Sequence, residues 1–157
     1  MFTTKVKRIL IGIAAVLALI LGIVAVVRIG KIEKTKDLGL TAYEIGTLSE
    51  TDGKEAKSDF AIRTKMQKAD KFNKITLADD ADVTYVIYYF NADKKFIGKS
   101  NAMSSETTEL ATKFTVNSAT ENVRYYRVVV LVPDTKDEVT LFNMNNYLKQ
   151  ITVTLNK

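Results

Sequence analysis

The fold is decided by one apolar run near the middle of the chain, which reads Val83-Thr84-Tyr85-Val86-Ile87-Tyr88-Tyr89-Phe90. Its residues are almost all β-branched or aromatic, and they are apolar on both faces of a strand. A second run at residues 125–132 has the same character and is followed by Pro133, the only proline. Because proline cannot donate to a strand ladder, its position marks the end of that strand. We therefore predict two neighbouring central strands in an all-β domain.

Shorter strand-like runs surround these two and are separated by polar breakers. In residues 72–77, and at the end of residues 147–155, much of the apolar content recurs at every second position, as on a half-buried strand. Residues 46–58 are polar and rich in turn formers, which predicts a surface loop, and residues 104–111 are also interpreted as loop. The remaining strand-like runs are residues 38–45, 60–66, 96–98, 113–116 and 139–142. Eight or nine short strands predict a single β-sandwich domain of jelly-roll type.

Residues 9–27 form an uninterrupted apolar segment without a charged or hydrogen-bonding side chain. As a helix this segment would be about 28 Å long, close to the roughly 30 Å hydrocarbon core of a bilayer. Inside lipid its backbone groups can be satisfied only by a helix, so its β-branched residues do not argue for a strand. We predict a basic tail at residues 1–8, a transmembrane helix at 9–27, a charged stalk at 28–37 and the β-sandwich at 38–157.

The apolar segment is longer than the roughly 7–15 residues of a signal-peptide core, and no small-x-small cleavage site follows it. These features favour an uncleaved anchor over a cleaved signal peptide. Three Lys or Arg precede the segment and four follow it, so the positive-inside rule does not decide its orientation. Ala14, Ala18 and Gly22 lie at four-residue spacing, which is typical of helix pairs in membranes. This face is a candidate for self-association, although Gly and Ala are common in membrane helices.

Charge and composition exclude several classes of function. Residues 1–36 contain seven Lys or Arg and one Glu, a net charge of +6, whereas the rest of the chain has a net charge of −1. The basic pI therefore comes from the membrane flanks, and no basic domain surface for nucleic acid is predicted. The chain contains no Cys and no His, which excludes disulfides, thiol or imidazole catalysis and ordinary zinc sites. We expect no cofactor and no metal.

Three stretches resemble small jelly-roll modules of Gram-positive surface and phage tail proteins. Tyr43-Glu44-Ile45-Gly46, a polar Thr-Asp-Gly loop and Phe60-Ala61-Ile62-Arg63-Thr64-Lys65 resemble the opening of such modules. Residues 88–98 resemble their aromatic strand and hairpin, and residues 125–130 resemble their late strand with an arginine after an aromatic residue. With the apolar segment in front, the chain is similar to uncharacterised single-pass surface proteins of Clostridia-type bacteria. The resemblance implies an extracellular domain, a cytoplasmic N-terminus, and carbohydrate or cell-wall contact.

Tyrosines are concentrated on the two central runs. Exposed aromatic rings on a jelly-roll face would stack on sugar rings, so Tyr85, Tyr88 and Tyr89 are candidate ligand-binding residues. The alternative, which we favour, is that they fill the core and pair across strands, as Tyr125 and Tyr126 would also do. Because Tyr85 and Tyr89 share one strand face and Tyr88 takes the other, part of the set must be core.

Arg63 and Arg127 lie within strand patterns and are further candidate ligand-binding residues. A guanidinium on a sheet face can hold a carboxylate or sugar hydroxyls in bidentate fashion. The alternative, which we favour, is an internal ion pair with a strand-borne acid such as Glu44 or Asp59.

Two polar segments are further candidate sites. Asp79, Asp80 and Asp82 carry oxygen ligands that suit Ca²⁺, but they lie at a turn and lack an EF-hand register, which favours a solvated loop. Residues 142–147 contain three asparagines, which predicts a turn stabilised by Asn side chains.

Together these observations predict a non-catalytic, membrane-anchored surface protein whose β-sandwich binds a glycan, the cell wall or another protein. The lipid bilayer is its first expected partner, and nucleic acid is not expected. The alternative is a structural or assembly subunit of a membrane-associated or pilin-like complex, held together by the helix and the sandwich edges. No motif predicts an enzyme.

Overall fold

The computed structural model describes residues 35–69, 73–104 and 107–156. The chain divides into two compact units, Met1–Lys34 and Thr35–Lys157, and the described residues all belong to the second. The basic tail, the apolar segment with Ala14, Ala18 and Gly22, and most of the expected stalk therefore lie outside them. Within the described part of the chain, no helix has the length and apolar character needed to cross a membrane.

The first sheet contains four antiparallel strands in the spatial order β1-β14-β7-β10. Its strands are β1 (Thr35–Asp37), β7 (Lys74–Leu77), β10 (Thr107–Glu109) and β14 (Ile151–Asn156). The alternation predicted for β7 and β14 is confirmed, because Ile75, Leu77, Ile151 and Val153 are buried.

The second sheet has the spatial order β2-β5-β13-β8-β9, and β6 also pairs with β13. Its strands are β2 (Tyr43–Ile45), β5 (Ala61–Thr64), β6 (Gln67–Lys68), β8 (Thr84–Phe90), β9 (Phe96–Lys99) and β13 (Tyr125–Leu131). The two predicted central strands are confirmed: β8 and β13 pair over their full length, from Tyr125 opposite Phe90 to Leu131 opposite Thr84.

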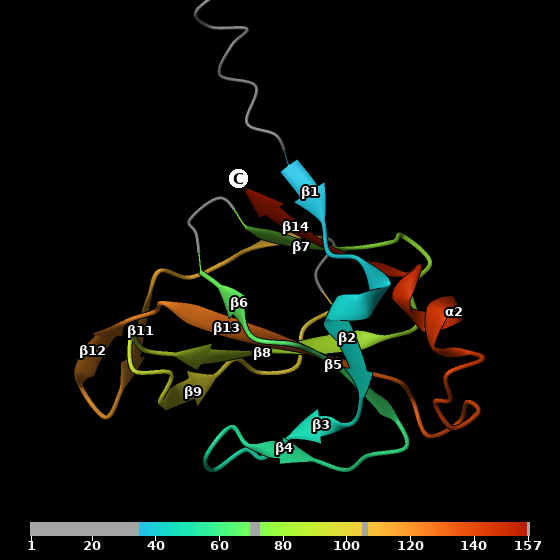
Figure 1. Cartoon of the computed structure of the whole chain (residues 1–157), viewed down its shortest axis with the longest axis horizontal. Coiled ribbons are helices and arrows are strands. Elements are labelled where there is room, and N and C mark those ends of the chain that lie inside the picture. Colours follow the sequence, from blue (N-terminus) through green and yellow to red (C-terminus); the bar gives the residue numbers. More distant parts are fainter. Residues whose placement is uncertain (1–34, 70–72, 105–106, 157) are drawn as a thin grey trace, which may run out of the picture. The chain divides into compact units, whose positions relative to one another are not determined.

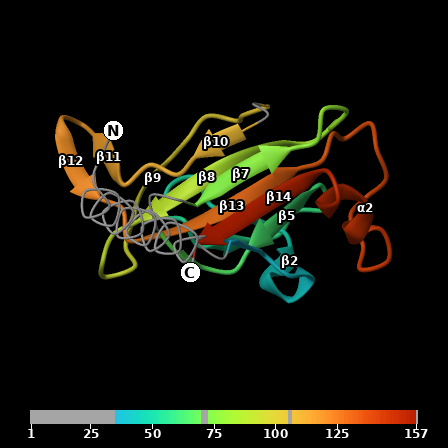
Figure 2. The ribbon, with the colours of Figure 1, turned by 90° about the horizontal axis from the view of Figure 1, so that it is seen from above.

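Two hairpins and two short helices complete the domain. They are β3 (Thr47–Leu48) with β4 (Glu55–Ala56), β11 (Lys113–Val116) with β12 (Ala119–Asn122), the 3-10 helix η1 (Leu40–Ala42) and α2 (Met144–Leu148). Figure 1 shows the β3–β4 hairpin on the side of the second sheet that faces away from β7 and β14. Both views place β7 and β14 over β8 and β13 (Figures 1 and 2). The all-β class is therefore confirmed.

Several predicted segments differ from the structure. Residues 139–142 are not a strand: the Thr140 N–H donates to Asn143 Oδ1 at 2.7 Å, and Asn143 Nδ2 donates to the Glu138 carbonyl at 2.8 Å. Such local side-chain bonds compete with a strand ladder. The turn predicted for residues 142–147 is confirmed only at its start, because α2 takes Met144–Leu148 and also replaces the first residues of the strand predicted at 147–155. In residues 38–45, η1 takes the middle and only β2 is strand. The predicted loops at 46–58 and 104–111 contain β3–β4 and β10.

The hydrophobic core has two parts on opposite faces of the second sheet. The larger part lies between the two sheets and includes Tyr85, Ile87 and Tyr89 from β8. The smaller part lies on the other face and includes Tyr88 from β8 and Leu48 from the β3–β4 hairpin. Strand β8 is therefore buried on both faces, which explains why its sequence is apolar at consecutive positions.

Burial of tyrosine rings makes the stability of this domain sensitive to alkaline pH. Burial raises the pKa of Tyr89 to about 12, with a smaller effect of Tyr85, and it also raises the pKa of Tyr126. Because the folded-state pKa lies above the unfolded value of 10, this stabilisation is complete below pH 10 and is lost as the pH rises towards 12.

We therefore expect the urea midpoint of unfolding to fall between pH 10 and 12, with Tyr89 contributing about 2 kcal/mol. Urea unfolding at a series of pH values, measured together with tyrosinate absorbance, checks this prediction. The Tyr89→Phe variant is the control. Its urea midpoint should fall less between pH 10 and 12, because it lacks the Tyr89 hydroxyl. Some fall should remain, because lysine titration is common to both proteins. A midpoint with the same pH profile in both proteins would contradict the prediction.

Candidate functional site

The three candidate tyrosines of β8 are all buried, so they do not form an exposed platform. Tyr85 and Tyr89 point between the sheets: the Tyr85 hydroxyl bonds to the Thr108 hydroxyl, and the Tyr89 ring lies 4.7 Å from the Phe114 ring. Tyr88 points to the opposite face and donates a hydrogen bond to the Leu48 carbonyl at 3.0 Å. The expectation of a stacking surface is therefore wrong, and the alternative core role is confirmed.

The physical reason is that both faces of β8 are covered. A sheet with one solvated face would have exposed either Tyr88 or the pair Tyr85 and Tyr89. Here the β3–β4 hairpin covers the face that carries Tyr88, and the first sheet covers the other.

Arg63 of β5 and Arg127 of β13 both lie on the hairpin-covered face of the second sheet. Arg63 Nη1 donates to the carbonyl oxygens of Thr47 at 3.3 Å and Ala56 at 3.1 Å, one on each strand of the hairpin. Arg127 Nε donates to the Thr64 carbonyl at 2.7 Å, and its side chain is only 8% exposed. The two guanidinium groups thus occupy the space between the sheet and the hairpin.

Two glutamates neutralise these guanidinium groups. Glu55 of β4 bridges them, with Oε2 3.0 Å from Arg63 Nη2 and Oε1 3.0 Å from Arg127 Nη1. Glu44 of β2 lies 3.4 Å from Arg63 Nε and 3.9 Å from Arg127 Nη2. Both arginines therefore have internal partners, so neither guanidinium group is left open to bind a ligand as the ligand-binding prediction requires.

The internal-pair alternative is confirmed for Glu44. It is wrong for Asp59, whose carbonyl accepts the Val139 N–H and which makes no ion pair with a described residue. Glu55 was missed because it lies in residues 46–58, which the sequence assigns to a surface loop. The cluster joins the hairpin to the sheet, and this is a structural role.

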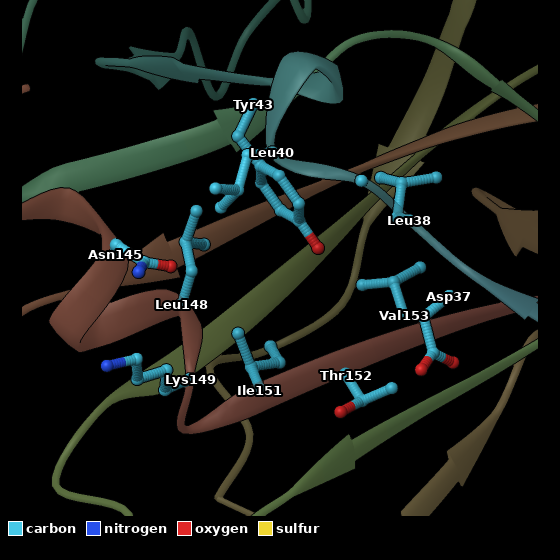
Figure 3. Close-up of a pocket in the computed structure, with 11 residues that line it drawn as sticks. Asp37, Leu38, Leu40, Tyr43, Asn145, Leu148, Lys149, Ile151, Thr152 and Val153 are labelled. Carbon is cyan, nitrogen blue, oxygen red and sulfur yellow. The ribbon is translucent and has the colours of Figure 1, made fainter.

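A second feature of the domain is a pocket of about 270 Å³ between η1, β2, α2 and β14 (Figure 3). Its aliphatic lining comes from Leu38, Leu40, Leu148, Ile151 and Val153. The polar side chains that line it are Asp37, Tyr43, Asn145, Lys149 and Thr152. Aliphatic walls combined with placed polar groups are found in small-molecule sites.

Tyr43 is the polar group at the centre of this pocket. Its residue is 8% exposed, and its hydroxyl points into the space between the aliphatic side chains (Figure 3). Burial, with a smaller contribution from the Asp37 carboxylate, raises the pKa of Tyr43 to about 12. The phenol is therefore neutral at physiological pH and is available as a hydrogen-bond donor.

The sequence did not predict this pocket. Its residues come from two segments, 37–43 and 145–153, which β14 and β1 bring together. The sequence assigns the first segment to a stalk and a strand, and the second to a turn and a strand. Within each segment the pattern carries no sign of a cavity.

In the aspartate cluster at the β7–β8 turn, Asp82 is engaged by neighbouring protein groups. Asp82 makes an ion pair with Lys136, and its backbone N–H donates to Gln150 Oε1 at 2.9 Å. Side-chain hydrogen bonds to the Asp82 carboxylate, above all from Lys136 and then from Gln150, lower the pKa of Asp82. In the part of the chain that the structure describes, no group of three or more acidic side chains could hold a metal ion.

Comparison of the chain with protein-family models, with curated proteins and with solved structures gave no match.

Proposed function

We propose that this protein is a single-pass, N-terminally anchored surface protein that displays a β-sandwich of jelly-roll type. The anchor is the apolar segment at residues 9–27, with the N-terminus in the cytoplasm and the domain outside the cell. The domain has a non-catalytic binding role. Its partner is a glycan, a cell-wall component or a protein, in addition to the lipid bilayer around the anchor.

The strand order of the domain supports the jelly-roll assignment. Eight strands pair in nested order: β1 with β14, β5 with β13, β7 with β10 and β8 with β9. The first strand thus pairs with the last and the innermost pair is a hairpin, as in a β-ribbon folded over into two sheets. This arrangement agrees with the resemblance to surface and phage tail modules.

The pocket around Tyr43 is the observation that carries the binding role. Burial of the three β8 tyrosines leaves no exposed stacking surface on that strand, and both arginines are neutralised internally. The pocket, in contrast, opens at the domain surface and presents a phenol hydroxyl between aliphatic walls. The same walls would accept an apolar group of a larger partner, such as a side chain of a protein.

Membrane orientation is tested by cysteine labelling, because the natural chain contains no cysteine. Lys57 is exposed in the loop after β4, and Thr3 lies in the basic tail. In intact cells that express the full chain, we expect a membrane-impermeant maleimide to label Lys57→Cys. The Thr3→Cys variant should be labelled only after lysis. If only Thr3→Cys were labelled in intact cells, the orientation would be the opposite of the one proposed. If neither variant were labelled before lysis, surface display would be contradicted.

An assembly role is the second candidate function, and one observation favours it. Leu141 and Phe142 are adjacent, and Phe142 is 99% exposed, which is unusual for a phenylalanine. Two such side chains suit contact with another protein subunit. Disulfide trapping of full-length Phe142→Cys in membranes distinguishes this candidate, since a subunit contact there yields a covalent dimer.

A further inference from the structure

Buried tyrosine hydroxyls in this domain are mostly satisfied by protein partners. Tyr85, Tyr88, Tyr126 and Tyr147 each form a hydrogen bond with a described residue. Tyr43 has no such bond among the described residues, although the residue is more than nine-tenths buried. A buried hydroxyl without a partner is costly, and it is a ready donor to any acceptor that enters the pocket.

The size of the pocket limits what can enter it. An apolar cavity of about 150 Å³ holds benzene, so the pocket of about 270 Å³ holds one ring with a short substituent. Its aliphatic walls would contact the apolar body of such a molecule. The pocket is too small for an oligosaccharide or a long acyl chain to be enclosed.

The charges around the pocket determine the polarity of its ligand. The negative field of Asp37 reaches the Tyr43 hydroxyl, as its contribution to the raised pKa of Tyr43 indicates. A second anion beside Tyr43 would be opposed by this field. Lys149 does not offset it, because its ammonium group points away from the Tyr43 hydroxyl (Figure 3). An uncharged acceptor is therefore favoured over a carboxylate.

We propose that the pocket binds a compact, uncharged apolar molecule whose carbonyl or ether oxygen accepts a hydrogen bond from the Tyr43 hydroxyl. This inference rests on the proposed binding function and adds a small-molecule ligand to the partners named there. The apolar body lies among Leu148, Ile151 and Val153, and the oxygen faces Tyr43.

The test is methyl NMR on the full chain in lipid nanodiscs, with Leu, Ile and Val methyl groups labelled. Three probes of similar size are titrated: cyclohexanone, methylcyclohexane and cyclohexanecarboxylate. We expect cyclohexanone to shift the methyl signals of Leu148, Ile151 and Val153. Methylcyclohexane, which has no acceptor, should bind about fivefold more weakly, and the carboxylate more weakly than the ketone.

Three variants locate the interaction. Tyr43→Phe removes only the hydroxyl and should weaken cyclohexanone binding about fivefold while leaving methylcyclohexane binding unchanged. Tyr89→Phe is the matched control, because Tyr89 is also buried without a hydroxyl partner among the described residues but does not line the pocket. Gly39 lines the pocket and has room for a Cβ, so the added ring of Gly39→Phe should weaken the binding of all three probes.

Each outcome has a separate meaning. The proposed ligand class would be wrong if all three probes bound equally, or if Tyr43→Phe left cyclohexanone binding unchanged. In either case the pocket would still be a binding site. If the domain is folded but no probe shifts the methyl signals of the pocket, both the ligand class and the pocket as the binding site would be wrong. Surface display is tested independently by the cysteine labelling.

Discussion

A Gly46→Ala variant is expected to have a free energy of unfolding about 3 kcal/mol lower than the natural protein. Gly46 has a φ of +126°, a backbone conformation that residues with a Cβ rarely adopt. An added Cβ would also lie 2.5 Å from Arg63 Nη1 and 2.8 Å from the Ala56 carbonyl oxygen. Arg63 and the β3–β4 hairpin would both have to move.

Urea unfolding of the two proteins measures this effect. Gly39→Ala is the matched control, because Gly39 has a φ of −71° and its added Cβ meets no atom within 4 Å. We expect that control to unfold at the midpoint of the natural protein or slightly above it. If Gly46→Ala and Gly39→Ala unfolded at the same midpoint, the close packing of Gly46 against Arg63 would be wrong.

An Arg127→Met variant is expected to lose about 2 kcal/mol of stability. Methionine preserves most of the apolar volume but leaves the Thr64 carbonyl without its 2.7 Å donor and removes one of the two cations that Glu55 bridges. The loss stays below the full cost of breaking a buried pair, because Glu55 is 54% exposed and can be hydrated.

Glu55→Gln provides the comparison, and we expect it to cost less than about 1 kcal/mol because the Glu55 side chain is itself 54% exposed. Hydrogen exchange gives a second measurement: amides of β3 and β4 should exchange faster in Arg127→Met, while those of β7 and β14 change little. Uniform acceleration of exchange across both sheets would show that Arg127 supports the whole domain and not the hairpin.

Much of the fold could be predicted from the sequence because strands leave local patterns. Apolar residues at every second position predicted β7 and β14, and consecutive apolar residues predicted β8 and β13 as central strands. The breakers between these runs, including Pro133, predicted where strands end. Segments with competing local signals were predicted less well, as at residues 139–142, where asparagine hydrogen bonds replace a strand.

The candidate sites were harder to predict, because each joins segments that are far apart in the chain. Arg63 and Arg127 were identified as charged strand residues, and Glu44 as one partner. The second partner, Glu55, lies on a hairpin that looks like an ordinary polar loop. Tyr43 belongs to a strand motif that carries no sign of a site, and its place in the pocket depends on Leu148 and Ile151, more than 100 residues later.

The sequence by itself determined the all-β class, the two central strands and the absence of any cysteine or histidine chemistry. These properties follow from composition and from the two-residue repeat of a strand, which are local. The tertiary structure decided which faces are covered. The β3–β4 hairpin buries Tyr88 and neutralises the arginines, and the approach of η1 to α2 leaves a pocket around Tyr43. A strand pattern states that a face is apolar, but only packing between distant segments determines what lies against it.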